Sequence, residues 1–337
     1  MADAIEFILN GRDVRVESVS PNITLLEYLR GTGLTGAKEG CAEGDCGACS
    51  VAIIDRDSQG QPCCRAINSC LVPLCLMAGR EIVSVEGVAG RGKLHPVQEK
   101  IAQGHGSQCG YCTPGVIMSL FEGYYRGDIR NPAQLDDQLC GNLCRCTGYR
   151  PIREAAINAF QERHEENGQD SFAKRLEKST AGLNAVEFEF AGQRFFRPVT
   201  LGALLQLVAQ FPEGRLIAGA TELGLDITKR FKKFPTLLSV EAVPELKKIE
   251  RTDTEWRIGA AATLTEIEEQ MADEFPVLAD MLRAFGSRQI RNRATMGGNL
   301  VTASPIGDSA PLLLALNASV VLASLESRAG LPPAPSG

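Results

Sequence analysis

All twelve cysteines of this 337-residue chain lie between Cys41 and Cys146, and residues 147–337 contain none. Such crowding is typical either of disulfides in a small secreted domain or of metal ligation. The chain is long, and its first residues, MADAIE, have neither the basic nor the apolar region of a signal peptide. We therefore expect metal ligation in a reducing cytoplasm, and a different chemistry in the C-terminal half.

Length and composition set broad limits on the fold and the partners. A chain of 337 residues predicts two or three domains, and 44% hydrophobic with 23% charged residues is typical of a soluble multidomain protein. The net charge of −6 gives no electrostatic reason to expect nucleic acid as a partner. The apolar stretch 310–323 is short and contains Asn317, so we expect no membrane span.

The first cysteine group is Cys41-x4-Cys46-x2-Cys49, written CAEGDCGAC, and Cys70 or Cys75 is its fourth candidate. This is the plant-type ferredoxin spacing for a [2Fe-2S] centre. Three glycines around the motif let the backbone wrap closely and direct N–H groups at the sulfurs. A structural zinc site is the alternative interpretation.

The second group combines Cys109-x2-Cys112 with Cys144-x-Cys146, each at an expected helix start. Helix N-termini present free N–H groups and a positive dipole to thiolates. Taken alone, this group also suits zinc.

Four cysteines are left over, and we expect them to be small buried or loop thiols. Two of them fall in a Gly, Pro and Gln loop and are candidates for surface thiols; the four are Cys63, Cys64, Cys75 and Cys140.

Hydrophobic patterns and turn signals divide the chain into segments. A hairpin around Asn10-Gly11, a helix ending at Gly31 and strands near 50–54 and 81–88 predict a small α+β unit. Four helices follow, and then a polar linker and a third domain of alternating strands and helices. The expected boundaries are 1–88, 89–163, 164–182 for the linker, 183–325, and 326–337 for a disordered tail. The helices are expected at 95–103, 113–125, 132–139 and 151–161, and the third domain is expected to open with a hairpin at 186–197, a helix at 201–210 and a strand at 215–218.

Two glycine-rich stretches mark the C-terminal half. Residues 216–224, LIAGATELG, predict a strand, a glycine turn and a helix start, an arrangement that directs N–H groups at a phosphate, although an ordinary turn fits as well. Residues 295–308 combine two glycines, small hydroxyls and an aspartate, which suits a diphosphate and a sugar or a tight loop. The basic run Arg288, Arg291 and Arg293 is interpreted as a solvated face.

Four blocks, CAEGDCGACSV, NSCLVPLC, SQCGYCTPG and GNLCRCTGYRPI, together resemble the iron–sulfur half of the molybdenum hydroxylases, the xanthine dehydrogenase and aldehyde oxidase superfamily. AGATELG and RNRATMGGNLVTASPIGDSAP resemble its FAD-binding domain. The resemblance implies an α+β multidomain fold: a β-grasp [2Fe-2S] ferredoxin domain, a four-helix [2Fe-2S]-binding domain and an α+β FAD-binding domain. It stops near residue 323, so we expect the FAD domain to lack its C-terminal part.

The resemblance also implies roles for individual residues. One cluster would be held by Cys41, Cys46, Cys49 and Cys70, and the other by Cys109, Cys112, Cys144 and Cys146. Gln108 would hydrogen-bond the molybdopterin of a partner. The implied FAD contacts are Leu216, Ile217, Ala218, Gly219, Ala220, Thr221, Glu222, Leu223, Gly224, Phe285, Thr295, Gly297, Gly298, Asn299, Thr302, Ser304 and Asp308. No residue is expected to be catalytic toward the substrate.

The function implied by the resemblance is electron transfer in a hetero-oligomeric, cytoplasmic enzyme of the xanthine dehydrogenase type. A separate large subunit would hold molybdopterin and the purine, and electrons would pass through the two clusters to FAD and on to NAD. Two alternatives stay open: the same relay in a hydroxylase of an aldehyde, nicotinate or an aromatic acyl thioester, and a zinc-stabilised interaction module.

Overall fold

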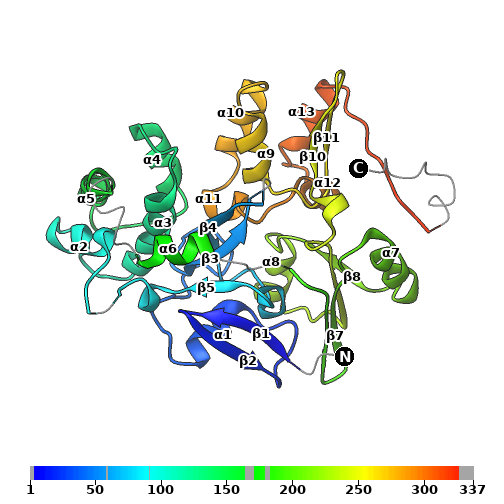
Figure 1. Cartoon of the computed structure of the whole chain (residues 1–337), viewed down its shortest axis with the longest axis horizontal. Helices are drawn as coiled ribbons and strands as arrows, with labels where there is room; N and C mark the ends of the chain where they lie inside the picture. Colours follow the sequence, from blue (N-terminus) through cyan, green and yellow to red (C-terminus); the bar gives the residue numbers. More distant parts are fainter. Residues whose placement is uncertain (1–3, 58–59, 91, 164–170, 179–182, 326–337) are drawn as a thin grey trace.

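The computed structural model describes residues 4–57, 60–90, 92–163, 171–178 and 183–325. A small sheet near the N-terminus, a group of helices beside it and a larger C-terminal part form three adjoining regions (Figure 1). The expected tail, 326–337, and most of the residues flanking the helix inside the expected linker lie outside the described residues. Within the described ranges, no helix has the length and apolar character needed to cross a membrane.

The N-terminal region is a five-stranded mixed sheet that carries one helix, as expected for a β-grasp unit. Its strand order is β2-β1-β5-β3-β4, with β1 and β5 parallel. Thr24 and Glu27 cap the helix reciprocally, which explains its start. The elements are β1 Ile5–Leu9, β2 Arg12–Val16, α1 Leu25–Gly31, β3 Ser50–Arg56, β4 Pro62–Asn68, β5 Glu81–Val83 and the short helices η1 Leu74–Met77 and η2 Val85–Gly87.

One strand of this sheet corrects the sequence analysis. Cys63 and Cys64 do not lie in a surface loop but on β4, which pairs with β3 along its whole length. The loop interpretation was wrong because Gly60 and Gln61 belong to the turn before the strand, and Pro62 is the first residue of β4. Cys64 is buried, and Cys63 faces a cavity described below.

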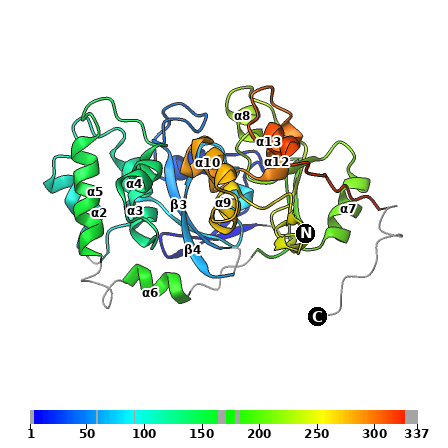
Figure 2. The same cartoon turned by 90° about the horizontal axis from the view of Figure 1, so that it is seen from above.

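The helical region confirms the four expected helices. They are α2 Pro96–Gln103, α3 Thr113–Tyr125, α4 Pro132–Leu139 and α5 Arg150–Glu162. All four carry proline in the first turn, where its missing N–H is harmless and its fixed φ favours a helix. The four helices lie beside β3 and β4, at the left of Figure 2.

A fifth helix corrects the expected linker. Residues Ser171–Lys178 form α6, inside the 164–182 segment predicted to lack packed structure. Phe172 and Leu176, one helical turn apart, pack on the helical core, and the Phe172 ring lies 4.6 Å from that of Phe121. Two apolar residues in a polar segment were too few to reveal this face from the sequence.

The C-terminal region begins with a four-stranded sheet of order β6-β7-β9-β8 and continues with a hairpin and short helices. The predicted opening hairpin and first helix are confirmed. The elements are β6 Val186–Phe190, β7 Gln193–Arg197, α7 Leu201–Gln210, β8 Arg215–Ile217, α8 Leu223–Thr228, β9 Thr236–Ser239, η3 Pro244–Leu246, β10 Ile249–Arg251, β11 Trp256–Ile258, α9 Leu264–Met271, α10 Pro276–Ala284, α11 Arg288–Arg291, α12 Met296–Thr302 and α13 Ser309–Ala315.

The regions share their cores. Phe188, Phe195 and Leu237 of the C-terminal sheet pack in one apolar cluster with Ile5 of β1 and Leu25 of α1 in the N-terminal region. Burying these side chains jointly fixes the first region against the third, since each buried side chain of this size contributes about 1.5–3 kcal/mol.

The basic run around α11 is not a solvated face. Arg288, Arg291 and Arg293 are 1%, 0% and 3% exposed. Each pairs with a carboxylate, respectively Glu122, Asp137 and Glu241. The expectation was wrong because these arginines face other regions of the chain, which local sequence does not reveal.

Candidate functional site

The first cysteine loop brings its thiols together in two pairs. The Cys49 and Cys70 sulfurs lie 3.3 Å apart. The backbone N–H groups of Cys41 and Cys46 each donate to the other residue's sulfur at 3.4 Å. A Cβ at Gly40 would stand 2.7 Å from the Cys46 sulfur, so a side chain there would intrude on the thiols.

The thiol of Cys49 is activated by its neighbour. Hydrogen bonding from the Cys70 thiol lowers the pKa of Cys49 to about 7, against the opposing effect of burial. The same interaction raises the pKa of Cys70. The pair thus readily holds one thiolate, the form that ligates metal.

The structure separates the four leftover cysteines from both groups. The Cys75 thiol is buried and donates to the Pro21 carbonyl at 3.3 Å, so Cys70 rather than Cys75 meets Cys49. Cys140 is exposed at the end of α4, where its thiol interacts with Arg291.

The second cysteine group also forms two pairs, Cys109 with Cys146 and Cys112 with Cys144. The backbone N–H of Tyr111 and the Cys146 thiol lower the pKa of Cys109. Cys109, Cys146 and the neighbouring Gln108 are exposed. The Cys109–Cys146 pair therefore lies at the surface of the chain, whereas Cys144, Cys49 and Cys70 are buried.

A 2+2 arrangement of thiols is what a binuclear cluster requires, because a [2Fe-2S] centre divides four ligands between two irons. The donor set and the pairing therefore fit two binuclear clusters.

The two cysteine loops contact one another directly. The N–H of Leu143, beside Cys144, donates to the Cys46 carbonyl at 3.0 Å. The Tyr111 hydroxyl, between the cysteines of the CxxC motif, donates to the Glu39 carbonyl. The sequence analysis missed both residues, since a backbone donor and a bridging tyrosine leave no motif.

In the C-terminal region the first glycine-rich stretch contacts Arg293 and Ala294, the residues directly before the second stretch. A Cβ at Gly219 would come within 1.6 Å of the Arg293 carbonyl, so only glycine permits the contact. Arg293 also donates to the Ala218 carbonyl at 3.4 Å. Ala220 has φ +68°, a strained left-handed conformation that turns the chain after β8.

Several of the expected phosphate-binding glycines have packing roles. A Cβ at Gly224 or Gly297 would collide with the backbone of Leu71 or Ala260, at 2.4 and 2.7 Å. Gly298 is exposed, and a Cβ there would approach only the Thr295 hydroxyl.

The polar residues of the second stretch are partly engaged within it. The Thr295 hydroxyl accepts the N–H of Gly298 and caps α12, and Thr302 donates to the Gly298 carbonyl at 2.9 Å. Asn299 accepts the Ser309 hydroxyl. Ser304 and Phe285 are half-buried, and Thr302 and Asp308 are exposed. The stretch thus presents hydroxyl and carboxylate groups beside an open glycine.

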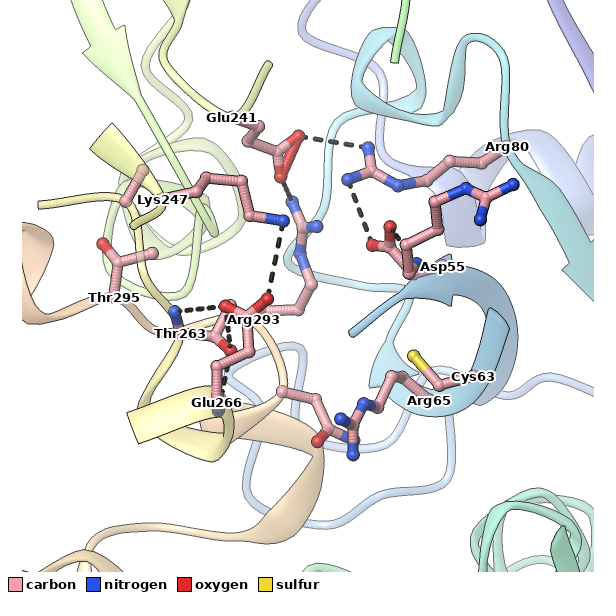
Figure 3. A pocket seen from close by; sticks show the side chains of 13 residues that line it. Asp55, Cys63, Arg65, Arg80, Glu241, Lys247, Thr263, Glu266, Arg293 and Thr295 are labelled. Carbon is pink, nitrogen blue, oxygen red and sulfur yellow. Dashed lines mark hydrogen bonds and ion pairs between the residues drawn. The ribbon is translucent and has the colours of Figure 1, made fainter. Parts of the chain in front are cut away.

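A cavity of about 30 Å³ lies between β3–β4 and the C-terminal region (Figure 3). Arg80 bridges Asp55 at 3.3 Å and Glu241 at 3.1 Å, and Glu241 also pairs with Arg293. Burial disfavours the Glu241 carboxylate, but Arg293 and Arg80 outweigh it and lower its pKa. The cavity is large enough only for water, so we interpret it as part of a charge network that joins the regions.

Comparison with known sequence families assigns all three regions. A family described as 2Fe-2S iron-sulfur cluster binding domain matches residues 7–75, and one described as [2Fe-2S] binding domain matches residues 84–157. A family described as FAD binding domain in molybdopterin dehydrogenase matches residues 187–333. Two [2Fe-2S] clusters and FAD are therefore the cofactors of this chain.

Two curated proteins are similar to nearly the whole of this chain. The chain is 37% identical to a xanthine dehydrogenase of Drosophila pseudoobscura pseudoobscura over 95% of its own length and 28% of the relative's. It is 34% identical to aldehyde oxidase 2 of Mus musculus over 98% of its length and 29% of the relative's. It is also similar to the solved quinoline 2-oxidoreductase of Pseudomonas putida 86, with 32% identity, a TM-score of 0.41, and coverage of 48% of this chain and 96% of that one. The chain spans less than a third of the length of these curated relatives. It belongs to the molybdenum hydroxylase family, of which it comprises the iron–sulfur and FAD-binding portion.

Proposed function

We propose that the chain relays single electrons between a molybdenum centre on a partner subunit and its own FAD. The two thiol pairs in each cysteine group support this assignment most directly. One cluster is held by Cys41, Cys46, Cys49 and Cys70, and the other by Cys109, Cys112, Cys144 and Cys146. When bound, the clusters carry one electron each and the flavin collects two.

The proposed direction runs from the helical cluster to the ferredoxin-type cluster and then to the flavin. Exposure of Cys109 and Cys146 supports electron entry at the helical cluster, beside Gln108, which would meet the partner's molybdopterin. The Leu143 N–H bonded to the Cys46 carbonyl provides a covalent and hydrogen-bonded path of a few atoms between the two cysteine groups.

The two adjoining glycine-rich stretches are the proposed flavin site. Residues 216–224 and the region of Gly297 and Gly298 would face the phosphates. Phe285, Thr295, Asn299, Thr302, Ser304 and Asp308 would contact the rest of the cofactor, Asp308 accepting from sugar hydroxyls. The exposed Gly298 and the exposed Asp308 carboxylate support this orientation.

The proposed enzyme is of the xanthine dehydrogenase type, with xanthine or hypoxanthine oxidised on a separate large subunit and NAD reduced in the cytoplasm. The similarity to a named xanthine dehydrogenase over 95% of the chain supports this choice. The similarity to an aldehyde oxidase keeps aldehyde oxidation as the second candidate.

Metal and flavin analysis of anaerobically purified chain tests the relay. We expect about four iron and four acid-labile sulfide per chain, no zinc, and bound FAD. The Cys49→Ser variant should lose the ferredoxin-type cluster, whereas Cys75→Ser should keep both, because the Cys75 thiol is buried and donates to the Pro21 carbonyl. Zinc in place of iron would exclude electron transfer, and equal loss in the two variants would refute the ligand set.

Steady-state assays distinguish the two substrates. Reconstitution with the co-expressed large subunit should give NAD-dependent oxidation of xanthine in preference to an aldehyde. Faster aldehyde oxidation, or no reduction of NAD, would refute the xanthine dehydrogenase assignment while leaving the cluster assignment intact.

A further inference from the structure

Helix α8 of the FAD-binding region lies against the loop of the first cysteine group. Three residues make the contact: Gly224 near the start of α8, Thr228 at its end, and Lys229 directly after it. The helix follows the glycine turn at once, and its Gly224 N–H donates to the Ala220 carbonyl at 2.7 Å. One short helix therefore touches both the proposed flavin turn and the first cluster loop.

Thr228 orients a peptide of the cysteine loop. Its hydroxyl donates to the Ala42 carbonyl at 2.8 Å, a shorter contact than the 3.1 Å to the Gly224 carbonyl. The carbonyl of Ala42 and the N–H of Glu43 belong to one planar trans peptide and point in opposite directions. Holding the carbonyl therefore directs the Glu43 N–H toward the Cys41 sulfur, to which it donates at 3.4 Å.

The conformation of Ala42 shows why this peptide needs support. Its φ of +56° lies in the left-handed region, which strains a non-glycine residue. The hydrogen bond from Thr228 compensates for this strain from outside the loop.

Lys229 adds a positive charge at the same place. Its ammonium donates to the Cys41 carbonyl and pairs with the Glu43 carboxylate at 3.2 Å. It therefore anchors the peptide that precedes the one held by Thr228, and places a cation on the backbone of the first cysteine of the loop.

Gly224 allows the helix to reach the loop. A Cβ at this position would lie 2.4 Å from the Leu71 carbonyl oxygen and 2.9 Å from the Leu71 Cα. Leu71 follows Cys70, so α8 is seated on the backbone next to a second residue of the thiol group. Any side chain at 224 would push α8 away from the Leu71 backbone.

We propose that α8 sets the reduction potential of the first cluster, with Thr228 and Lys229 as positioning residues that act through the Cys41–Glu43 backbone. The proposal rests on the cluster assignment made above. Hydrogen bonds to sulfur and nearby positive charge favour the reduced, more negative cluster and so raise its potential. The flavin-binding region would thereby adjust the donor from which it takes electrons.

Potentiometric measurement of the whole chain, followed by electron paramagnetic resonance, tests the proposal. Thr228→Val removes the hydroxyl at nearly constant volume and should shift the first cluster to a more negative potential, while Thr228→Ser should restore the wild-type value. Lys229→Met should shift the same cluster in the same direction and Lys229→Arg should not. The second cluster, held on other elements, should keep its potential in all four variants and is the internal control.

The Gly224→Ala variant provides an independent test of the proposal. It should reproduce the negative shift of Thr228→Val, whereas Gly127→Ala, where a Cβ would meet nothing within 4 Å, should leave both potentials unchanged. A wild-type potential for the first cluster in Thr228→Val and Lys229→Met would overturn the proposal. Equal shifts of both clusters would also overturn it. A wild-type chain without iron would instead refute the cluster assignment itself.

Discussion

Arg288 and Glu122 are separated by 166 residues in sequence, yet the arginine Nε donates to the carboxylate at 3.2 Å in the interior. Their side chains are 1% and 0% exposed. The same carboxylate accepts the backbone N–H of Ala66 and the side-chain amide of Asn292. Glu122 thus joins α3 of the helical region to β4 of the N-terminal region through Ala66, and to the C-terminal region through Arg288 and Asn292.

Glu122→Gln should destabilise the protein by about 3 kcal/mol at neutral pH, because removing one charge of a buried pair leaves Arg288 uncompensated. The direction in which pH changes this contribution to stability follows from the pKa of Glu122. Burial alone would raise the pKa of Glu122, but Arg288, Arg126 and Arg65 outweigh burial and lower it below 4.5. The carboxylate therefore stabilises the fold fully above about pH 4.5, and this contribution is lost as the pH falls through the lowered pKa.

Urea unfolding between pH 3 and pH 8 measures this effect. The difference between wild type and Glu122→Gln should be largest at neutral pH and should shrink on acidification. Glu154→Gln, in the exposed Arg150–Glu154 pair, is the matched control and should behave like wild type. A pH-independent difference would show that shape, and not charge, explains the loss.

Local signals predicted the elements well, and contacts between regions poorly. Prolines at helix starts and the Thr24 cap predicted α1 to α5, since those features act within one turn. Local signals also predicted, wrongly, that Arg288, Arg291 and Arg293 lie in solvent. Their carboxylate partners are far away in sequence, over 100 residues for Arg288 and Arg291 and over 50 residues for Arg293. Glu122 did leave a signal, a single charge inside the apolar run GVIMSLFEGYY.

The same contrast between local signals and long-range contacts holds for the cysteine groups. Spacing alone left Cys70 and Cys75 as rivals, and only the fold brings the Cys70 thiol to Cys49. The contacts between the two loops involve the Leu143 backbone N–H and the Tyr111 hydroxyl, neither of which belongs to a pattern that sequence can identify.

Cys63 should resist alkylation in the folded protein. Burial beside the interdomain cavity raises the pKa of its thiol to about 12, so almost none of the reactive thiolate exists at pH 8. Mass spectrometry after iodoacetamide treatment should find Cys63 unmodified in native protein and modified after unfolding in urea. Equal labelling in both states would mean that β4 is open to solvent.

Glu241→Gln should loosen the C-terminal region from the N-terminal sheet. Its carboxylate pairs with both Arg80 and Arg293; in the variant Arg80 keeps its pair with Asp55, whereas the buried Arg293 guanidinium faces a neutral amide. We expect the free energy of unfolding to fall by about 3 kcal/mol, and the single calorimetric transition to separate into two.

The control for this change is Glu250→Gln, whose carboxylate forms an exposed pair with Lys248. It should leave the calorimetric profile unchanged. A single, merely shifted transition in Glu241→Gln would show that apolar packing alone couples the regions.

Gly115→Ala should weaken the magnetic coupling between the two reduced clusters. A Cβ at 115 would stand 2.0 Å from the Gly47 carbonyl oxygen, which belongs to the first cysteine loop, while Gly115 lies three residues after Cys112 on α3. Neither backbone can yield without separating the loops, so α3 must move away. Because dipolar coupling falls steeply with distance, the extra splitting in the electron paramagnetic resonance spectrum of the fully reduced protein should decrease.

Gly127→Ala is the control, since its Cβ would enter open space, and its spectrum should match that of wild type. Undiminished splitting in a folded Gly115→Ala variant that contains both clusters would show that the Gly47 contact does not fix their separation.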